Sequence, residues 1–252
     1  MTVFLTILFA LTVVLEFVFV PLFLKYSWPK KCWKSFGYKM ICSALFFLAG
    51  VLAMKISGNT STYAKLILWG LFFGWLGDLF LHLITDKVYV FGLGLFAFLG
   101  GHIFYIAAFN TAIHYNLQPD APLLAWYEIL AVILIVGAMA AYVVVKKIRT
   151  KIYMAIPVAM YAVTISTMLV KACTLSYHIW NQSMANEHIL PMILLIVGAV
   201  FFVLSDGSLG LILFGGQDKN KHLKWFNIGT YFAAQILLGS TIFCISSTLP
   251  YA

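Results

Sequence analysis

Two aspartates lie within long apolar stretches of the chain, where a charged side chain is unusual. Asp78 occurs in the stretch 71–82 and Asp206 in the stretch 201–209. Each follows a small residue and precedes a leucine by three positions. A carboxylate at bilayer depth costs roughly 3 kcal/mol on insertion scales, so such residues usually face a bundle interior or a wet cavity and serve a function. We therefore expect Asp78 and Asp206 to converge on one site.

A pair of carboxyl groups in an apolar pocket is suited to acid–base chemistry. A low-dielectric surrounding favours the protonated form of a carboxyl group, and a second acid nearby favours it further for one member of the pair. That member can donate a proton while the other stays ionised. Glycoside hydrolases use two carboxyl groups in the same two roles. The sequence leaves open which of Asp78 and Asp206 would be the acid.

Polar side chains in other apolar stretches could complete such a pocket. Glu16 lies at a similar depth to the two aspartates, and His82 shares a helix face with Asp78 because the two are four residues apart. The supporting residues that we predict from type and depth are Glu16, Lys39, His82, His102, Tyr105, Tyr161, Ser205, Tyr231 and Gln235.

Two charged residues near the ends of apolar stretches have plainer interpretations. Lys39 opens the second apolar stretch, where its long side chain could reach lipid phosphates in general or bind one phosphate of a substrate. Glu128 lies close to the opposite surface, and we expect it to be solvated.

The elements that must position these residues are membrane-spanning helices. Of the 252 residues, 63% are hydrophobic and only 10% are charged, against about 25% charged in an ordinary soluble domain. A membrane helix needs about 20 mainly apolar residues, and the stretches that qualify are 2–24, 39–56, 64–84, 89–111, 123–145, 152–172, 188–214 and 225–248. We predict an all-α, polytopic bundle of about eight transmembrane helices that forms a single domain over residues 1–252. We expect it in the cell membrane of a bacterium or the endoplasmic reticulum of a eukaryote.

The distribution of lysine and arginine predicts the orientation of this bundle. Of the 16 basic residues, all except Lys55, Lys65 and Lys171 fall on one side of the predicted spans. Because cytoplasmic loops carry the excess of lysine and arginine, that side should face the cytoplasm. Both termini would then lie on the non-cytoplasmic side, and the two aspartates about two-thirds of the way toward the cytoplasm.

Composition and spacing also exclude several function classes. The formal net charge of +8 is explained by membrane topology, so we expect no nucleic-acid partner. The cysteines are scattered, without the spacing of a disulfide framework or a zinc site. No serine lies in a recognisable nucleophile turn. We predict neither a metal nor a cofactor, and the oligomeric state stays open.

The succession of motifs resembles the lysoplasmalogenase (YhhN-like) family of eight-helix membrane proteins. The motifs are Gly77-Asp78-x-x-Leu81, Phe98-x-x-Gly101-His102-x-x-Tyr105, Tyr161 with Met168, Gly198-Ala199-x-x-Phe202-x-x-Ser205-Asp206-x-x-Leu209 and Tyr231-x-x-Ala234-Gln235. They run from the third predicted helix to the last. The first two helices match less well, since the family often has Lys-Pro where this chain has Lys39 followed by Met40.

The resemblance implies hydrolysis of the vinyl ether bond of lysoplasmalogens, without a cofactor. The substrate would be a lysophospholipid drawn from the membrane lipids, and the products a fatty aldehyde and a glycerophospho-ethanolamine or -choline. The residues alone also allow a proton-coupled transporter, because intramembrane carboxylates and repeated helix motifs occur there. A non-enzymatic lipid-binding protein on the same scaffold is the other alternative.

Overall fold

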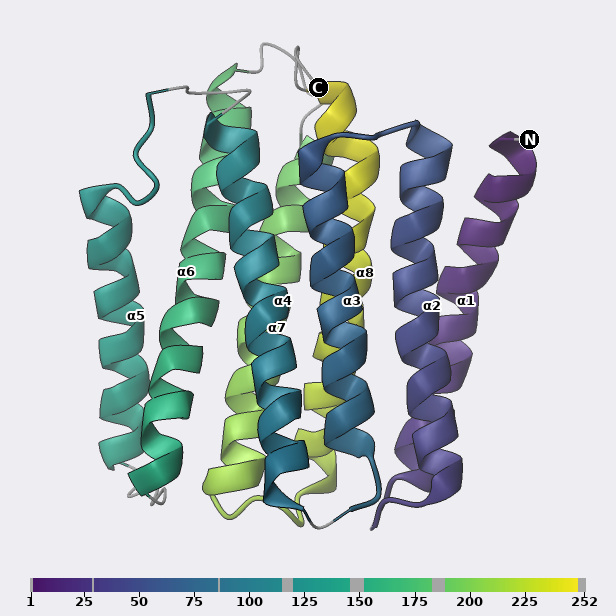
Figure 1. Cartoon of the computed structure of the whole chain (residues 1–252), viewed down its shortest axis with the longest axis vertical. Coiled ribbons are helices and arrows are strands. Elements are labelled where there is room, and N and C mark those ends of the chain that lie inside the picture. The colour runs from purple at the N-terminus through teal and green to yellow at the C-terminus, as the bar shows by residue number, and fades with distance from the viewer. Residues whose placement is uncertain are drawn as a thin grey trace.

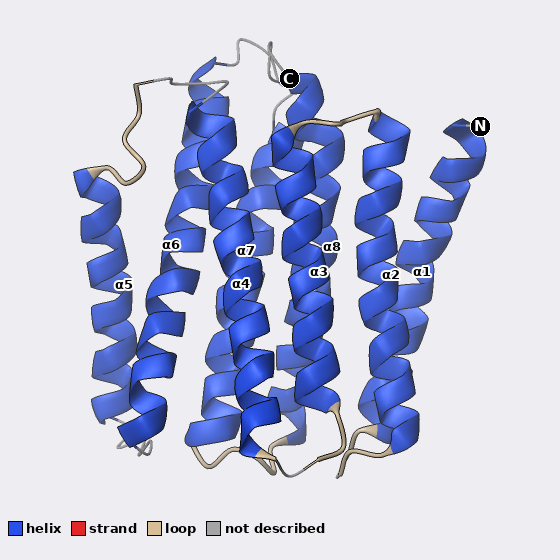
Figure 2. Ribbon diagram, viewed as in Figure 1, coloured by secondary structure: helices blue, strands red, loops and turns tan. Residues whose placement is uncertain are grey.

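Eight α-helices make up the fold in the computed structural model, which describes residues 2–28, 30–85, 87–114, 120–145, 152–182 and 189–248 (Figure 1). They are α1 (Thr2–Tyr26), α2 (Trp33–Ser57), α3 (Thr62–His82), α4 (Val88–Ala112), α5 (Trp126–Val145), α6 (Ile152–Gln182), α7 (Ile189–Phe214) and α8 (Lys221–Thr248). Figure 2 shows no strand in the described part of the chain. All eight helices are long and apolar enough to cross a membrane, which confirms the predicted all-α membrane bundle.

The helices lie side by side and alternate in direction, so α1 begins and α8 ends at the same end of the bundle (Figure 1). α3, α4, α7 and α8 form the centre, while α5 packs on α6 at one edge and α1 packs on α2 at the other. The side of the membrane that this end faces stays a prediction. The basic residues within 146–151, which support that prediction, lie outside the described residues.

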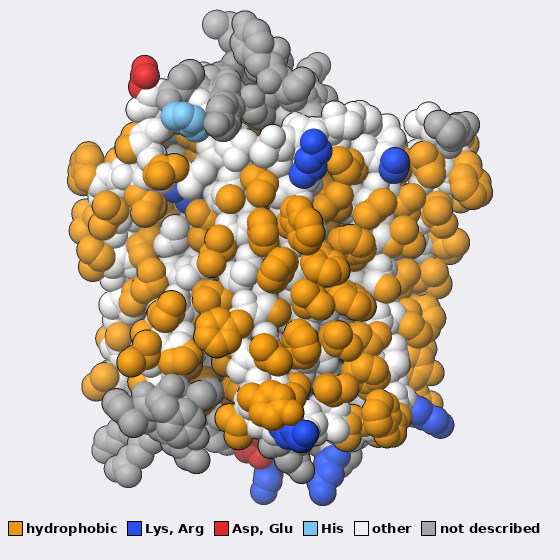
Figure 3. Space-filling model, in the orientation of Figure 1, with side chains coloured by type: hydrophobic (Ala, Val, Ile, Leu, Met, Phe, Trp, Pro, Cys, Tyr) orange, Lys and Arg blue, Asp and Glu red, His pale blue; other side chains and the backbone are white. Residues whose placement is uncertain are grey.

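The surface of the bundle matches a lipid-facing protein. Figure 3 shows apolar side chains over the middle of the visible face, with lysines gathered toward the two ends. Large apolar side chains such as Phe17, Phe96 and Ile133 are more than half exposed. Because exposed patches of this size mark membrane or protein contacts, the described helices belong to an integral, multi-pass membrane protein.

Two helices extend well beyond their predicted spans. α2 begins at Trp33 and not at residue 39, because Cys32 and Ser35 form a reciprocal capping box that starts the helix earlier. α6 continues to Gln182 and not only to residue 172, since polar groups in its later turns find partners on α5. The earlier start of α2 places Lys39 nearly two turns inside the helix.

Glycines on α3 let the neighbouring helices approach closely. A Cβ atom on Gly101 of α4 would lie 3.1 Å from the carbonyl oxygen of Gly70, so the two backbones almost touch. At Gly74 a Cβ atom would overlap the side-chain amide of Gln235 on α8. The absent side chain lets the hydroxyl of Tyr231 on α8 approach the Gly74 carbonyl oxygen to 3.3 Å. α3 thereby brings its polar residues within reach of α4 and α8.

Candidate active site

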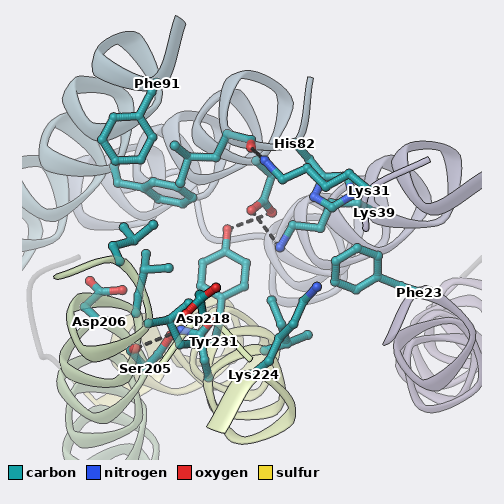
Figure 4. Close-up of a pocket in the computed structure, with 18 residues that line it drawn as sticks. Phe23, Lys31, Lys39, His82, Phe91, Ser205, Asp206, Asp218, Lys224 and Tyr231 are labelled. Atoms are coloured by element: carbon teal, nitrogen blue, oxygen red, sulfur yellow. Dashed lines mark hydrogen bonds and ion pairs between the residues drawn. The ribbon is translucent and has the colours of Figure 1, made fainter. Parts of the chain in front are cut away.

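A cavity of about 260 Å³ lies in the half of the bundle nearer the α1–α2 and α7–α8 connections (Figure 4). Asp78 and Asp206 both line it, so the structure brings the two aspartates to one cavity, as the sequence predicted. The other polar lining residues are Lys31, Lys39, His82, Ser205, Asp218, Lys224, Asn227 and Tyr231, and the apolar ones include Leu81, Phe91, Phe98, Leu209, Ile212 and Leu213.

Both carboxylate oxygens of Asp78 are engaged by the protein. Lys39 Nζ lies 2.8 Å from Oδ1, while the hydroxyls of Ser43 and Tyr231 donate to Oδ2 at 2.5 and 2.9 Å. Lys39 and Ser43 are four residues apart, so both project from one face of α2 toward α3. The Asp78 side chain is only 3% exposed. Asp78 is therefore one member of a buried ion pair whose hydrogen bonds are complete.

A chain of hydrogen bonds orients Tyr231. The amide nitrogen of Gln235 donates to the Tyr231 hydroxyl at 3.1 Å, and the hydroxyl of Tyr105 donates to the amide oxygen of Gln235 at 2.7 Å. Tyr105 and Gln235 do not line the cavity, whereas Tyr231 does. Their role in this geometry is to hold Tyr231, and through it the carboxylate of Asp78.

Asp206 has a different environment on the other side of the cavity. Its Oδ2 accepts a hydrogen bond from the Tyr161 hydroxyl at 2.6 Å and lies 3.1 Å from Nε2 of His102. No hydrogen bond from a described residue reaches Oδ1, and the side chain is 12% exposed. In Figure 4 Asp206 lies across the cavity from Lys39. Asp206 thus lines the cavity with only one of its two oxygens engaged by described residues.

The contacts around His102 require one proton more than a neutral His102 ring and an ionised Asp206 provide. Its Nδ1 lies 3.2 Å from the sulfur of Met168, and a thioether accepts hydrogen bonds but does not donate them, so Nδ1 carries the ring proton. Nε2 of a neutral ring is then an acceptor, 3.0 Å from the Tyr161 hydroxyl. The single proton of that hydroxyl cannot serve both Nε2 and ionised Asp206. One additional proton, on Nε2 or on Asp206, satisfies every contact.

The two aspartates have related surroundings. Each aspartate has a partner on the helix that precedes its own in the chain. Lys39 of α2 pairs with Asp78 on α3, and Tyr161 of α6 donates to Asp206 on α7. Each is also contacted from the other half of the chain, Asp78 by α8 and Asp206 by α4. Each half of the chain thus contributes a contact to the aspartate of the other half. This arrangement fits an internal repeat, which is also suggested by the motif of a small residue, Asp, two residues and Leu that both aspartates share. In the described part of the chain, no three His, Cys, Asp or Glu residues lie close enough to hold a metal ion.

Comparison with known families decides the classification of the chain. The sequence model of the YhhN family matches residues 35–242, a range that contains every side chain of the two aspartate clusters. The chain belongs to the YhhN family. This family includes lysoplasmalogenases, so the resemblance seen in the motifs is confirmed. No curated protein and no solved structure matches the chain.

The remaining predicted residues of this YhhN protein lie at different distances from the aspartates. His82 lines the cavity with its Nε2 3.0 Å from the Ser35 hydroxyl. Ser205 also lines it and accepts hydrogen bonds from the side-chain amide of Asn227. Glu16 does not line the cavity. It is buried, and neither carboxylate oxygen has a hydrogen-bond partner among the described residues.

Two charged residues lie deeper in the bundle than an interpretation of the sequence placed them. Of the two interpretations of Lys39, contact with the lipid surface is wrong: Lys39 is 5% exposed and paired with Asp78, because α2 starts earlier than predicted and carries it into the bundle. Glu128 is not solvated but 1% exposed. It accepts hydrogen bonds from Lys171 at 2.7 Å and from Thr174 at 2.7 Å, and Thr174 lies on the part of α6 beyond the predicted span.

Sequence reasoning missed several residues of the YhhN site. Ser43 could have been found from its four-residue spacing to Lys39, which places both on one face of α2. Asn227 gives a weaker signal, since a polar residue near a helix start is ordinary. Lys31 and Lys224 were assigned only to topology, because nothing in the sequence separates a lysine at a cavity mouth from one in a solvated loop.

Proposed function

We propose that this YhhN protein is a membrane-embedded hydrolase that cleaves the vinyl ether bond of lysoplasmalogens. The products are a fatty aldehyde and a glycerophospho-ethanolamine or -choline. The observation that carries the proposal is the hydrogen-bonded cluster of Asp206, His102 and Tyr161, of which Asp206 lines the cavity. Membership of a family that includes lysoplasmalogenases supports the same reaction.

The first chemical step is proton transfer from Asp206 to the outer carbon of the vinyl ether. The electron pair of the carbon–carbon double bond forms the new C–H bond, and the ether oxygen shares the positive charge of the resulting oxocarbenium ion. Asp206 is the better donor of the two aspartates, because its Oδ1 has no partner among the described residues, whereas both oxygens of Asp78 are engaged. His102 and Tyr161 contact the opposite oxygen and stabilise the carboxylate that the transfer leaves.

The second step is addition of water to the oxocarbenium carbon. Asp206, now a carboxylate, accepts the proton that the water loses, and its negative charge stabilises the neighbouring cation before the addition. The hemiacetal then collapses: the ether oxygen takes a proton and leaves on the glycerol, and the hydroxyl loses a proton as the aldehyde forms. One water is consumed, and the proton returns to the Asp206 cluster.

Asp78 has the complementary role in this scheme. Because Lys39, Ser43 and Tyr231 occupy both of its oxygens, it is not free to exchange protons with a substrate. It acts as a fixed negative charge in the cavity wall and holds the ring of Tyr231 against the substrate. A cavity of about 260 Å³ is near the lower end of small-molecule sites, roughly 300–1,000 Å³, so it accommodates the vinyl ether and glycerol while the alkyl chain extends beyond it.

Aldehyde release by the purified protein tests this function. In maltoside detergent, the wild-type protein should release fatty aldehyde from a lysoplasmalogen. It should release neither aldehyde nor fatty acid from 1-alkyl and 1-acyl lysophospholipids of the same chain length, because only the vinyl ether can form the oxocarbenium ion by carbon protonation. Mass spectrometry of the products measures all three reactions. A transporter or a lipid-binding protein without enzymatic activity would release no aldehyde, and that result would refute the proposal.

A further inference from the structure

The cavity carries two lysines that the proposed reaction does not use. Lys31, from the α1–α2 connection, and Lys224, near the start of α8, line it together with Lys39. In Figure 4 these lysine side chains lie across the cavity from Asp206. Lys39 is paired with Asp78, but neither Lys31 nor Lys224 forms an ion pair with a described carboxylate. This side of the cavity therefore has two positive charges without a carboxylate partner in the described part of the chain.

Each of the two ammonium groups is anchored on a backbone carbonyl. Lys31 Nζ donates to the carbonyl oxygen of Leu81 at 2.6 Å, and Lys224 Nζ donates to that of Ser27 at 2.7 Å. These carbonyls lie at the end of α3 and just after α1, where helix carbonyls lack intrahelical partners. Because an ammonium group has three donors, both lysines still have donors for a ligand beyond these bonds.

The surroundings of Lys31 favour an anion as that ligand. Partial burial, and next the positive charge of Lys39, hold the pKa of Lys31 below its ordinary value. Lys224 adds a third ammonium group to the same cavity. An anion bound between Lys31 and Lys224 would relieve this accumulation of positive charge through short, charge-assisted hydrogen bonds.

We propose that Lys31 and Lys224 bind the phosphodiester of a lysophospholipid and thereby hold its vinyl ether against Asp206. The identity of the lipid rests on the proposed function. The vinyl ether and the phosphate are attached to opposite ends of one glycerol, so a phosphate at the lysines directs the vinyl ether toward the other side of the cavity. Asp218 also lines the cavity, and its carboxylate suits the ammonium group of an ethanolamine or choline head group.

Binding of a substrate analogue that cannot react tests this site. The probe is a saturated 1-O-alkyl glycerophosphoethanolamine, measured by calorimetry in phosphate-free maltoside detergent with the wild type and with Lys31→Gln, Lys224→Gln and the double variant. Loss of one charged hydrogen bond should weaken binding about tenfold, and loss of both about a hundredfold.

In turnover, the KM of the lysine variants should rise by similar factors while kcat changes little, since neither lysine contacts the reacting carbon. Lys34→Gln, three residues from Lys31, and Lys221→Gln, three residues from Lys224, remove lysines that do not line the cavity. Both variants should bind the probe like the wild type.

Two further ligands identify the part of the lipid that is recognised. The alkylglycerol without phosphate should bind weakly and equally to the wild type and the double variant. Inorganic phosphate should not displace the probe at concentrations where the probe itself binds; if it does, the site is one for free phosphate and the proposal is wrong. Equal probe affinity in the wild type and the double variant, or no binding by the wild type, would also overturn it. Binding of the probe by a protein that releases no aldehyde would reject the proposed function and leave the phosphodiester site standing.

Discussion

Replacement of Asp206 by asparagine should lower the turnover of lysoplasmalogen about 10²- to 10⁴-fold, the range that a positioned general acid contributes. The amide keeps the shape of the side chain and can still accept the hydrogen bond from Tyr161, so the protein should stay folded. Only the proton that reaches the alkene carbon is removed. Initial rates of aldehyde release, set against the thermal unfolding temperature in detergent, measure the two effects separately.

Two companion variants sharpen the Asp206 prediction. Asp120→Asn removes a carboxylate from an exposed position outside the cavity and should turn over at the wild-type rate. Asp206→Glu keeps the acid but moves it by one methylene, so it should retain more activity than the asparagine variant. A turnover by Asp206→Asn within a few-fold of the wild type would remove Asp206 from the chemistry.

Replacement of Asp78 by asparagine should destabilise the protein by about 3–5 kcal/mol, the usual effect of removing one partner from a buried ion pair. The variant leaves the ammonium group of Lys39, which is 5% exposed, without its carboxylate. Tyr231 also loses an acceptor at 2.9 Å, so turnover should fall together with stability. Thermal unfolding in detergent and aldehyde release report the two losses.

A double variant separates the structural role of this ion pair from its catalytic role. Lys39→Met with Asp78→Leu replaces the pair by apolar side chains of similar volume, a change that is often neutral or stabilising in a buried position. Stability should therefore recover to near the wild-type level, while turnover should stay low because the fixed negative charge is gone. A double variant that is both stable and fully active would show that the ion pair only holds the helices together.

The membrane fold could be predicted almost completely from the sequence, because hydrophobic length is a strong and local signal. All eight spans were found, and the errors are at helix ends. The ends of α2 and α6 depend on side-chain partners, namely the reciprocal bonds of Cys32 with Ser35 and the contacts of Thr174 with Glu128. A hydrophobicity profile contains no information about such side-chain partners, so the helix turns that they stabilise were not predicted.

The location of the candidate site was predictable from the sequence, but the hydrogen-bond and ion-pair partners of the two aspartates were not. The cost of burying a charge singled out Asp78 and Asp206, and the structure brings both to one cavity. The partners of each aspartate come from other helices, so the sequence offered Lys39 only lipid or substrate phosphate as a partner, whereas it is the counter-ion of Asp78. The difference between the two acids follows from those partners, and no local pattern could reveal which oxygen is free.

The central claim is that a fixed acid in the cavity delivers a proton to the alkene carbon. Hydrolysis in D₂O, with the aldehyde reduced to the alcohol as it forms, tests this claim most directly. We expect one deuterium per molecule on the carbon next to the former carbonyl, in a single configuration, because Asp206 reaches the alkene from one side only. An alcohol without deuterium at that carbon would contradict carbon protonation, and a racemic label would contradict delivery by a group of the protein.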